Sequence, residues 1–248
     1  MPVIASESVF TPAVHVAMLW VTLWAVFSAV ALGRVWSEKT VRWGLAVLGV
    51  LVWVGSGLFF SLWPTEMGEG GGMKLEESLP IQACDLLALF APVSLVVSSK
   101  WLRAVVYFGA IGLTTQAFLT PVIETGPDTL RFWVFWAVHI SILVCALFEL
   151  IVGGYRPDVF ALLRAIGFWL LYAVSMIALD AYTGWYYGYL GPEIPESAED
   201  SVLQYLGDWP VRPVVMMGIV VVIFVVLWLP WAVARRVGGA QRNPPQGP

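Results

Sequence analysis

Seven long apolar segments constrain this chain more than any other feature of its sequence. They cover about 14–33, 43–63, 80–98, 102–123, 131–152, 160–182 and 212–234. A helix needs about 20 apolar residues to cross the hydrocarbon core of a bilayer. The segments are continuously apolar, and an open sheet cannot satisfy its backbone in lipid. We therefore predict an all-α membrane protein, a single domain of seven transmembrane helices over 1–234 with a short polar tail at 235–248.

The scarcity of charge supports this class of protein. Charged residues make up only 12% of the 248 residues, whereas a soluble domain carries roughly 25%. A surface with so few charges must face lipid over most of its area. The formal charge of −4 is small, and no basic patch would follow the phosphates of a nucleic acid. We expect a multi-pass protein of the cell membrane whose partners are lipids and not nucleic acids; the sequence names no protein partner.

The distribution of basic residues sets the expected orientation, because cytoplasmic loops are enriched in Lys and Arg. Three of the 13 basic residues, Lys74, Arg131 and Arg212, fall on one side of the predicted bundle, and the other ten fall opposite. We therefore expect the N-terminus outside and the C-terminus in the cytoplasm. Residues 1–13 contain no Lys or Arg, which argues against a cleaved signal peptide.

Two long loops lie on the predicted outer side. Residues 64–79 are rich in Gly and Glu, which is typical of a solvated loop. Residues 183–211 begin with a group of aromatic side chains that includes Tyr187, and such groups gather at membrane interfaces. We expect this second loop to lie over the bundle as a lid, with Tyr187 as one of its binding residues.

Polar side chains inside the predicted spans carry the strongest functional signal. Such groups are costly in lipid and usually face the interior of a bundle. Predicted depths place one set of them in the outer half of the membrane, on four consecutive helices. The set comprises Gln82, Cys84, Asp85, Gln116, Arg131, His139 and Asp180. We therefore expect a polar pocket near the outer face.

These polar residues also have purely structural interpretations. Asp85 and Arg131 would form an ion pair, since charges in a membrane seldom stay single. Gln116 would join neighbouring helices, and Asp180 lies near a helix end, where contact with water costs little. Glu149 is expected to be a solvated residue at the cytoplasmic boundary.

His139 is the candidate general base. It lies eight residues into its predicted span, which corresponds to a depth of roughly 12 Å. Histidine is the commonest general base near neutral pH, although a neutral imidazole also serves as a satisfied buried donor. His15, at the outer end of the first span, is interpreted as an interfacial residue.

Several other chemistries are excluded by the residues that are missing from the spans. Every Lys lies in a predicted loop or at a helix edge, so a retinal Schiff base is excluded. Two histidines without an HExxH motif or a close cysteine pair do not make a transition-metal site. The chain has no GxSxG elbow, phosphate-binding loop or dinucleotide fingerprint. We expect no metal and no cofactor, with Cys84 and Cys145 as free thiols.

Several stretches, in their order and spacing, carry a family resemblance. They are LPIQACDLLALFAP (79–92), TTQAFLTP (114–121), LRFWVFWAVHISI (130–142), GYRP (154–157), GWYYGYL (184–190), LGDWP (206–210) and LWLPW (227–231). In these stretches the chain resembles the YwaF-type bacterial membrane proteins, which share a family with eukaryotic transmembrane protein 164. The resemblance implies a seven-helix fold. Through the eukaryotic branch it also implies acyl transfer on membrane phospholipids by a cysteine and a histidine.

The chain departs from the family pattern at several positions of the expected pocket. The departures are Gln82, Asp180, Tyr186 and Asp208, where bacterial relatives tend to have His, Asn, Asn and Pro. Glutamine cannot act as a base. The reactive cysteine of the eukaryotic branch aligns with either Ile81 or Cys84, whereas His139 and Gln116 match the pattern.

Three hypotheses follow. The leading one is a membrane enzyme for acyl transfer or hydrolysis on lipids, with His139 as base and Cys84 or water as nucleophile. Asp85, Gln116 and Arg131 would then orient groups or stabilise charge. The alternative is a non-enzymatic lipid- or amphipath-binding protein, sensor or carrier that uses the same pocket. In the third, the polar residues only hold the helices together, in a structural subunit of a larger complex.

Overall fold

The computed structural model describes residues 11–62, 79–121, 123, 126–192 and 202–242, and regular secondary structure there is entirely helical. The longer helices are α1 (Pro12–Val35), α2 (Glu38–Leu62), α4 (Ala83–Val96), α5 (Lys100–Gly109), α7 (Leu130–Ile151), α8 (Val159–Thr183) and α9 (Val211–Arg242). Short helical segments are η1 (Ala110–Thr114), α6 (Gln116–Leu119), η2 (Tyr187–Tyr189) and η4 (Val202–Tyr205). The predicted all-α class is confirmed.

Within the described residues, six helices are long and apolar enough to cross a membrane. They cover Pro12–Val35, Glu38–Ser61, Lys100–Leu119, Leu130–Ile151, Val159–Thr183 and Val211–Val237. Each overlaps one of the predicted spans. The chain is therefore an integral membrane protein with several crossings.

The third predicted span, 80–98, is helical only over the 14 residues of α4, which is about 21 Å at the helical rise. Its ends explain the difference. Gln82 caps the N-terminus in a non-helical conformation, and Val97 at the other end is extended. Directly after it, the Ser99 hydroxyl accepts a hydrogen bond from the Leu102 N–H and starts α5. Capping residues on both sides thus make α4 shorter than the apolar run that contains it.

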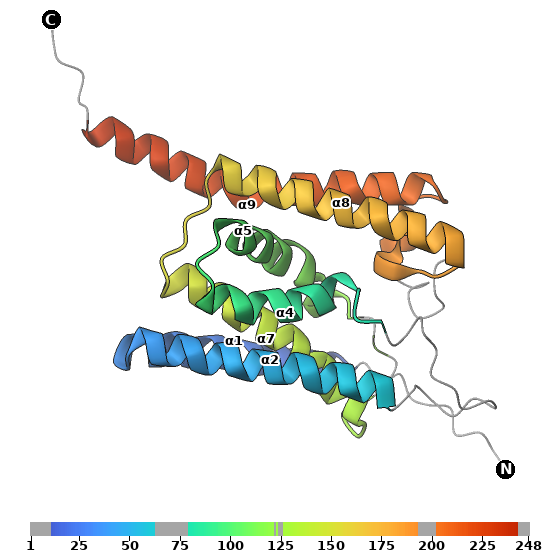
Figure 1. Ribbon diagram of the computed structural model, residues 1–248, viewed down its shortest axis with the longest axis horizontal. Coiled ribbons are helices and arrows are strands. Elements are labelled where there is room, and N and C mark those ends of the chain that lie inside the picture. The colour runs from blue at the N-terminus through green and yellow to red at the C-terminus, as the bar shows by residue number, and fades with distance from the viewer. Residues whose placement is uncertain (1–10, 63–78, 122, 124–125, 193–201, 243–248) are drawn as a thin grey trace, which may run out of the picture.

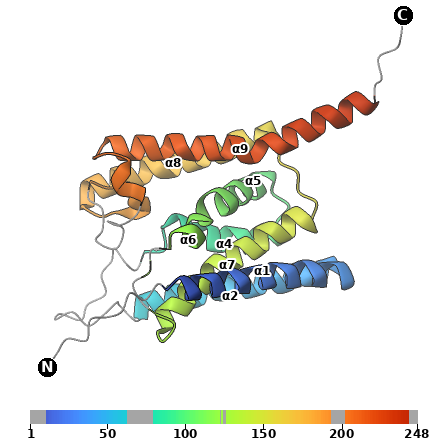
Figure 2. The same ribbon diagram turned by 180° about the vertical axis from the view of Figure 1, so that it is seen from behind.

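The helices form three layers (Figure 1). Helices α1 and α2 make one outer layer, α8 and α9 make the other, and α4, α5 and α7 lie between them, as the opposite view also shows (Figure 2). Successive long helices run in alternating directions, so their connections gather at two ends. The end with residues 36–37, 97–99 and 152–158 is here named the Glu149 end. The opposite end, where α4 starts, is the Gln82 end.

The middle layer contains the core, and the outer layers present apolar side chains outward. Every residue from Ala104 to Ala110 is buried. On α1, by contrast, Trp20, Trp24 and Phe27 are each at least 61% exposed. Large exposed apolar side chains over whole helices fit a lipid surround. They also explain why so few charges suffice for this chain.

Two glycines let the middle layer pack closely against the outer layer of α8 and α9. A Cβ on Gly109 would lie 2.5 Å from Cζ2 of Trp169 on α8, and a Cβ on Gly112 would lie 2.9 Å from Cε1 of Phe224 on α9. Gly112 belongs to the π-helical turn η1, which continues α5 towards α6. Such turns are rare and often occur at functional sites. Here the turn places a residue without a side chain directly against Phe224.

The C-terminal region differs from the prediction. Residues 235–242 of the predicted polar tail continue α9 as helix, which extends past the other helices (Figure 1). The Arg235 guanidinium donates a 2.8 Å hydrogen bond to the Pro157 carbonyl. This contact ties the helix to the α7–α8 connection beyond its apolar part. Residues 243–248 lie outside the described part of the chain.

Candidate functional site

The start of α4 is organised by two of the predicted site residues. Gln82 is the N-cap, and its backbone N–H donates a 3.1 Å hydrogen bond to Oδ2 of Asp85. A carboxylate three residues after the cap satisfies a donor that the first helical turn leaves without a partner. It also lies at the end of the helix where negative charge is favoured. Asp85 is thereby held in a fixed position at the Gln82 end.

The loop after α8 lies over this helix start. The Gly188 N–H donates to Oε1 of Gln82 at 3.0 Å, and the Tyr187 hydroxyl donates to the Leu79 carbonyl at 3.4 Å. From α8 itself, the Tyr172 hydroxyl donates to the Ile81 carbonyl at 3.0 Å. These three bonds fasten the loop 184–191, here named the strap, and the end of α8 onto residues 79–82.

Asp180 and Tyr187 fix the shape of the strap. The Asp180 side chain is fully buried, and its Oδ1 accepts a 3.0 Å hydrogen bond from the Tyr187 N–H. Tyr187 is buried as well. Left-handed backbone at Gly184, Gly188 and Tyr189 turns the chain back over α4. Asp180 is therefore not the water-exposed helix end that the sequence suggested, because the strap covers it.

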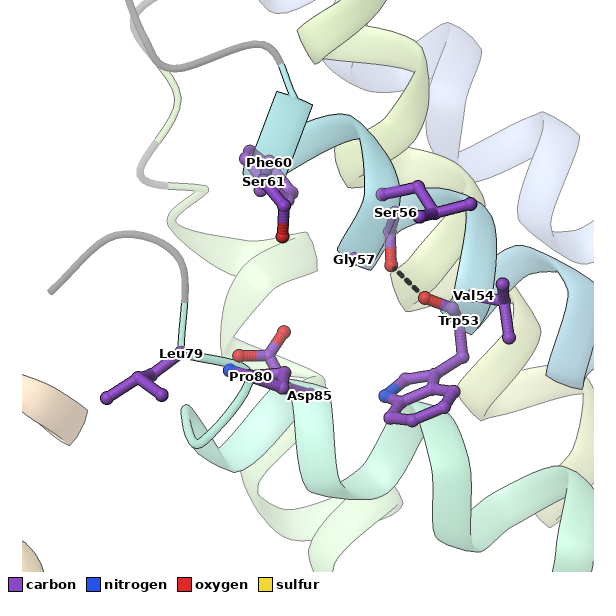
Figure 3. A pocket seen from close by; sticks show the side chains of 10 residues that line it. Trp53, Val54, Ser56, Gly57, Phe60, Ser61, Leu79, Pro80 and Asp85 are labelled. Carbon is purple, nitrogen blue, oxygen red and sulfur yellow. Dashed lines mark hydrogen bonds between the residues drawn. The ribbon is translucent and has the colours of Figure 1, made fainter. Parts of the chain in front are cut away.

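A pocket lies between α2 and the start of α4, with a volume of about 250 Å³ (Figure 3). Among its ten lining residues Asp85 is the only ionisable one. Its carboxylate points into the space below Ser61, and Trp53 and Phe60 contribute aromatic rings from α2. The Ser56 hydroxyl is occupied by a 2.8 Å hydrogen bond to the Trp53 carbonyl. The pocket is thus mainly apolar, with one carboxylate that can bind a donor or a cation.

The pocket opens towards the outside of the bundle. Val54 and Leu58 line it and are 41% and 55% exposed on the outer face of α2. That face is otherwise apolar, with Leu48 and Leu51 exposed on the preceding turns. The side of the pocket formed by Val54 and Leu58 is therefore continuous with the exposed apolar face of α2.

Cys84 lies beside Asp85 in sequence but in different surroundings. The thiol is free, half-buried and packed against the core. Its electrostatic neighbours include the hydroxyls of Tyr172 and Tyr189, and it does not line the pocket. Burial raises the pKa of the Tyr189 hydroxyl to about 12, so that hydroxyl remains a neutral donor near the thiol.

His139 is buried on α7 among aromatic rings. Its Nδ1 forms a 2.7 Å hydrogen bond with the Phe135 carbonyl, and its ring centroid lies 4.2 Å from that of Phe135 and 6.4 Å from that of Phe118. This cluster joins α7 to α6 and α1, because the His15 ring bonds the Phe118 carbonyl. Within the described residues no hydrogen bond joins Cys84 to His139. The nucleophile and base expected from the sequence therefore lie in separate surroundings.

Gln116 and Arg131 both lie at the surface. The Arg131 guanidinium is 5.9 Å from the centre of the Phe60 ring, and Phe60 lines the pocket. The expected ion pair between Arg131 and Asp85 does not occur among the ion pairs of the described residues. Arg131 is thus a cation at the rim of the pocket.

The Glu149 end contains a polar network that the sequence analysis missed. Glu149 is buried and forms ion pairs with Arg42 from α2 and, at 3.2 Å, with Nε of Arg103 from α5. Arg42 also donates to the Leu95 carbonyl at 3.0 Å and to Oε1 of Glu38 at 2.6 Å. The interpretation of Glu149 as a solvated boundary residue is therefore wrong. All of these residues lie on the same predicted side of the membrane. Their shared depth in the sequence-based topology could have indicated that they form a network.

The described residues at the two ends do not form a metal site. Among the described residues no three His, Cys, Asp or Glu side chains converge on one point. The pocket instead combines a carboxylate with hydroxyls and aromatic rings, groups that bind a hydrogen-bond donor or an organic cation.

A comparison with protein-family models decides the affiliation. The model of the TMEM164 family matches residues 9–228, which is most of the chain. This chain belongs to the TMEM164 family. The match includes α1 and α2, which lie outside the stretches that carried the resemblance, and it confirms the predicted membership. No curated protein and no solved structure matched the chain.

Stretches that carried the TMEM164-family resemblance meet in pairs in this structure. The stretches 79–92 and 184–190 meet through Gln82 and Gly188 at one end. At the other end 154–157 meets 227–231, where the Arg156 guanidinium lies 4.8 Å from the centre of the Trp231 ring.

Proposed function

We propose that this TMEM164-family protein binds a membrane lipid, with the head-group end of the lipid in the pocket between α2 and α4. One observation carries the proposal. A single carboxylate, Asp85, faces an otherwise apolar cavity that opens through the lipid-facing side of α2. Asp85 is half-buried and accepts a hydrogen bond from the Gln82 N–H. A partly desolvated charge with few partners is unfavourable, so Asp85 favours a ligand that brings donors or positive charge.

The size and the surroundings of the pocket favour an amine-bearing phospholipid. A volume of about 250 Å³ suits a head group and not an entire lipid. The ammonium group would lie against Asp85 and the Trp53 ring, where ionic and cation–π attraction act together. Arg131, held over Phe60 at the rim, would bind the phosphate. The acyl chains would follow the exposed face of α2.

In this proposal the chain crosses the cell membrane with seven helices. The short α4 would cross it in addition to the six long helices, and residues 79–82 and the strap would complete this crossing at the Gln82 end. The excess of Lys and Arg at the Glu149 end supports a cytoplasmic location for that end. The N-terminus and the pocket would then lie on the outer side.

Acyl chemistry on the bound lipid is the second candidate, favoured by family membership and by the half-buried thiol next to Asp85. In such a reaction the Cys84 thiolate would attack an ester carbonyl and form a thioester, and the departing lysolipid alkoxide would take up the proton lost from the thiol and leave as an alcohol. Water or an acceptor hydroxyl would then take the acyl group. A base within hydrogen-bond reach is required. Because His139 is bound to Phe135 in another cluster, binding is proposed ahead of catalysis.

Photo-crosslinking tests the binding proposal. A phosphatidylethanolamine analogue with a photoactivatable group near the amine would be incorporated into nanodiscs with the purified protein. We expect crosslinks on α2 around Trp53 and Phe60, reduced at least several-fold in Asp85→Asn and unchanged in Ser175→Ala, a substitution on the exposed face of α8. Crosslinks spread equally over all lipid-facing helices would contradict a defined site.

Lipidomes of cells producing wild type, Cys84→Ser or His139→Ala would separately reveal acyl turnover.

A further inference from the structure

A cluster of polar side chains with unused hydrogen-bonding capacity lies at the Glu149 end, away from the pocket between α2 and α4. The Tyr155 hydroxyl is buried in the connection between α7 and α8, and within the described residues it makes no hydrogen bond. Its ring packs against Tyr107 at 5.8 Å between centroids, and its backbone N–H donates to the Glu149 carbonyl at 3.1 Å. The position of this hydroxyl is thus fixed. A buried hydroxyl without a partner is unfavourable and calls for an explanation.

Two arginines near this hydroxyl have donors to spare. Arg103 forms an ion pair with Glu149 through Nε and donates no hydrogen bond to any other described residue. Arg164, in the second turn of α8, has neither a hydrogen bond nor an ion pair among the described residues. The charges of both act on the Tyr155 hydroxyl. Burial raises the pKa of that hydroxyl, so it is present as a donor.

The neighbouring charged groups are already engaged. Glu149 is bound by Arg42 and Arg103, and the Asp158 carboxylate accepts a 2.7 Å hydrogen bond from the Ala161 N–H as the cap of α8. Arg156 donates to the carbonyls of Leu150 and Tyr155 and lies over Trp231. Tyr155, Arg103 and Arg164 are therefore the groups left to bind a ligand, and all three are donors.

We propose that Tyr155, Arg103 and Arg164 form a binding site for a phosphate group, supplied by an acidic phospholipid of the leaflet at the Glu149 end. Arginine forks match phosphate oxygens, and basic pockets between transmembrane helices bind anionic head groups. The lipid origin is supported by Phe160 and Leu163, which flank Arg164 on α8 and are 62% and 57% exposed. They offer an apolar surface for acyl chains beside the phosphate. Inorganic phosphate presents the same chemistry from solution.

Thermal unfolding of the full-length protein in detergent micelles tests this site. Phosphatidylglycerol should raise the melting temperature of the wild type, and phosphatidylcholine should raise it less. Tyr155→Phe removes only a hydroxyl that has no hydrogen-bond partner among the described residues. Without anionic lipid its melting temperature should therefore equal or exceed that of the wild type. Its apparent affinity for phosphatidylglycerol should fall about tenfold, the factor expected when a hydrogen bond to a charged group is lost.

Further variants and a soluble anion complete the test. Arg164→Gln should weaken phosphatidylglycerol binding at least as much as Tyr155→Phe does. Arg236→Gln changes an exposed arginine of α9 towards the Glu149 end and should leave the binding unchanged. If millimolar inorganic phosphate stabilises the wild type as well as the lipid does, and both variants abolish this effect, the site stands with a soluble anion as its ligand. Equal stabilisation of the wild type, Tyr155→Phe and Arg164→Gln by phosphatidylglycerol would overturn the proposal. So would an equal response of the wild type to phosphatidylcholine.

Discussion

The backbone N–H of Gly188 donates a 3.0 Å hydrogen bond to Oε1 of Gln82, and this bond joins the strap to the start of α4. The two residues are 106 positions apart in the chain. Gln82 also carries the backbone N–H that holds Asp85. A single residue thus connects the cover of the Gln82 end with the carboxylate of the pocket. This linkage gives a structural role to a glutamine at a position where the family resemblance led us to expect histidine.

Replacing Gln82 should loosen the strap. In Gln82→Ala the Gly188 N–H loses its acceptor, so we expect a loss of about 1–2 kcal/mol in the free energy of unfolding and faster access to Cys84. The measurement is the rate of Cys84 alkylation in native protein, with Cys145→Ala as the common background. Gln116→Ala, at an exposed glutamine, is the matched control. Equal alkylation rates in the two variants would show that the bond does not hold the strap closed.

Removing the Asp180 carboxylate should also destabilise the strap, at its contact with the end of α8. Asp180→Ala leaves the buried Tyr187 N–H without its acceptor, at a cost of about 1–3 kcal/mol. Asp180→Asn keeps an acceptor oxygen and should retain more of the stability. Thermal unfolding in detergent compares the two variants. A larger loss in Asp180→Asn than in Asp180→Ala would contradict the assigned hydrogen bond.

Glu149 should be required for the packing of three helices. Glu149→Gln leaves Arg42 and Arg103 without their shared carboxylate, and breaking a buried ion pair costs about 3–5 kcal/mol. Replacing both charged side chains by apolar ones, in the double variant Arg42→Met with Glu149→Leu, should destabilise the protein by less than the sum of Arg42→Met alone and Glu149→Leu alone. Unfolding curves of the two single variants and the double variant measure this coupling. Strict additivity would mean that the two side chains do not interact.

Gly109 should tolerate no side chain. Gly109→Ala brings a Cβ to within 2.5 Å of Trp169, so we expect destabilisation of about 1–3 kcal/mol from overpacking. Gly44→Ala on α2 is the control, because a Cβ there meets no atom within 4 Å, and alanine in a helix is favoured over glycine by roughly 1 kcal/mol. The two variants should shift the melting temperature in opposite directions. A stabilised Gly109→Ala would contradict the close packing of α5 on α8.

The sequence predicted six of the seven spans well, because each of the six is a long apolar run that forms one long helix or a nearly continuous helical segment in the described residues. The position of a residue along its helix could be predicted too, by counting from the end of the apolar run. The direction in which a side chain faces could not. Cys84 and Asp85 are adjacent, yet one helical residue turns the chain by about 100°, and only Asp85 faces the pocket.

The direction in which each side chain faces also separates the other predicted site residues. His139 lies in the first half of α7, as the sequence predicted, but its side of the helix faces α1 and α6. Gln116 follows the π-helical turn η1 and lies at the surface. No local pattern in the sequence indicates that turn. The full burial of Asp180 could not be predicted from its place near a helix end, because the strap that covers it is formed by later residues of the chain.

The central claim is that Asp85 binds the head group of a membrane lipid between α2 and α4. Native mass spectrometry of the purified protein, released from mild detergent, tests it most directly. We predict that the wild type and Ser175→Ala carry a co-purified phospholipid with an amine-bearing head group, and that Asp85→Asn loses most of it while keeping its melting temperature within a few degrees. A bound lipid retained in full by a folded Asp85→Asn variant would contradict the account.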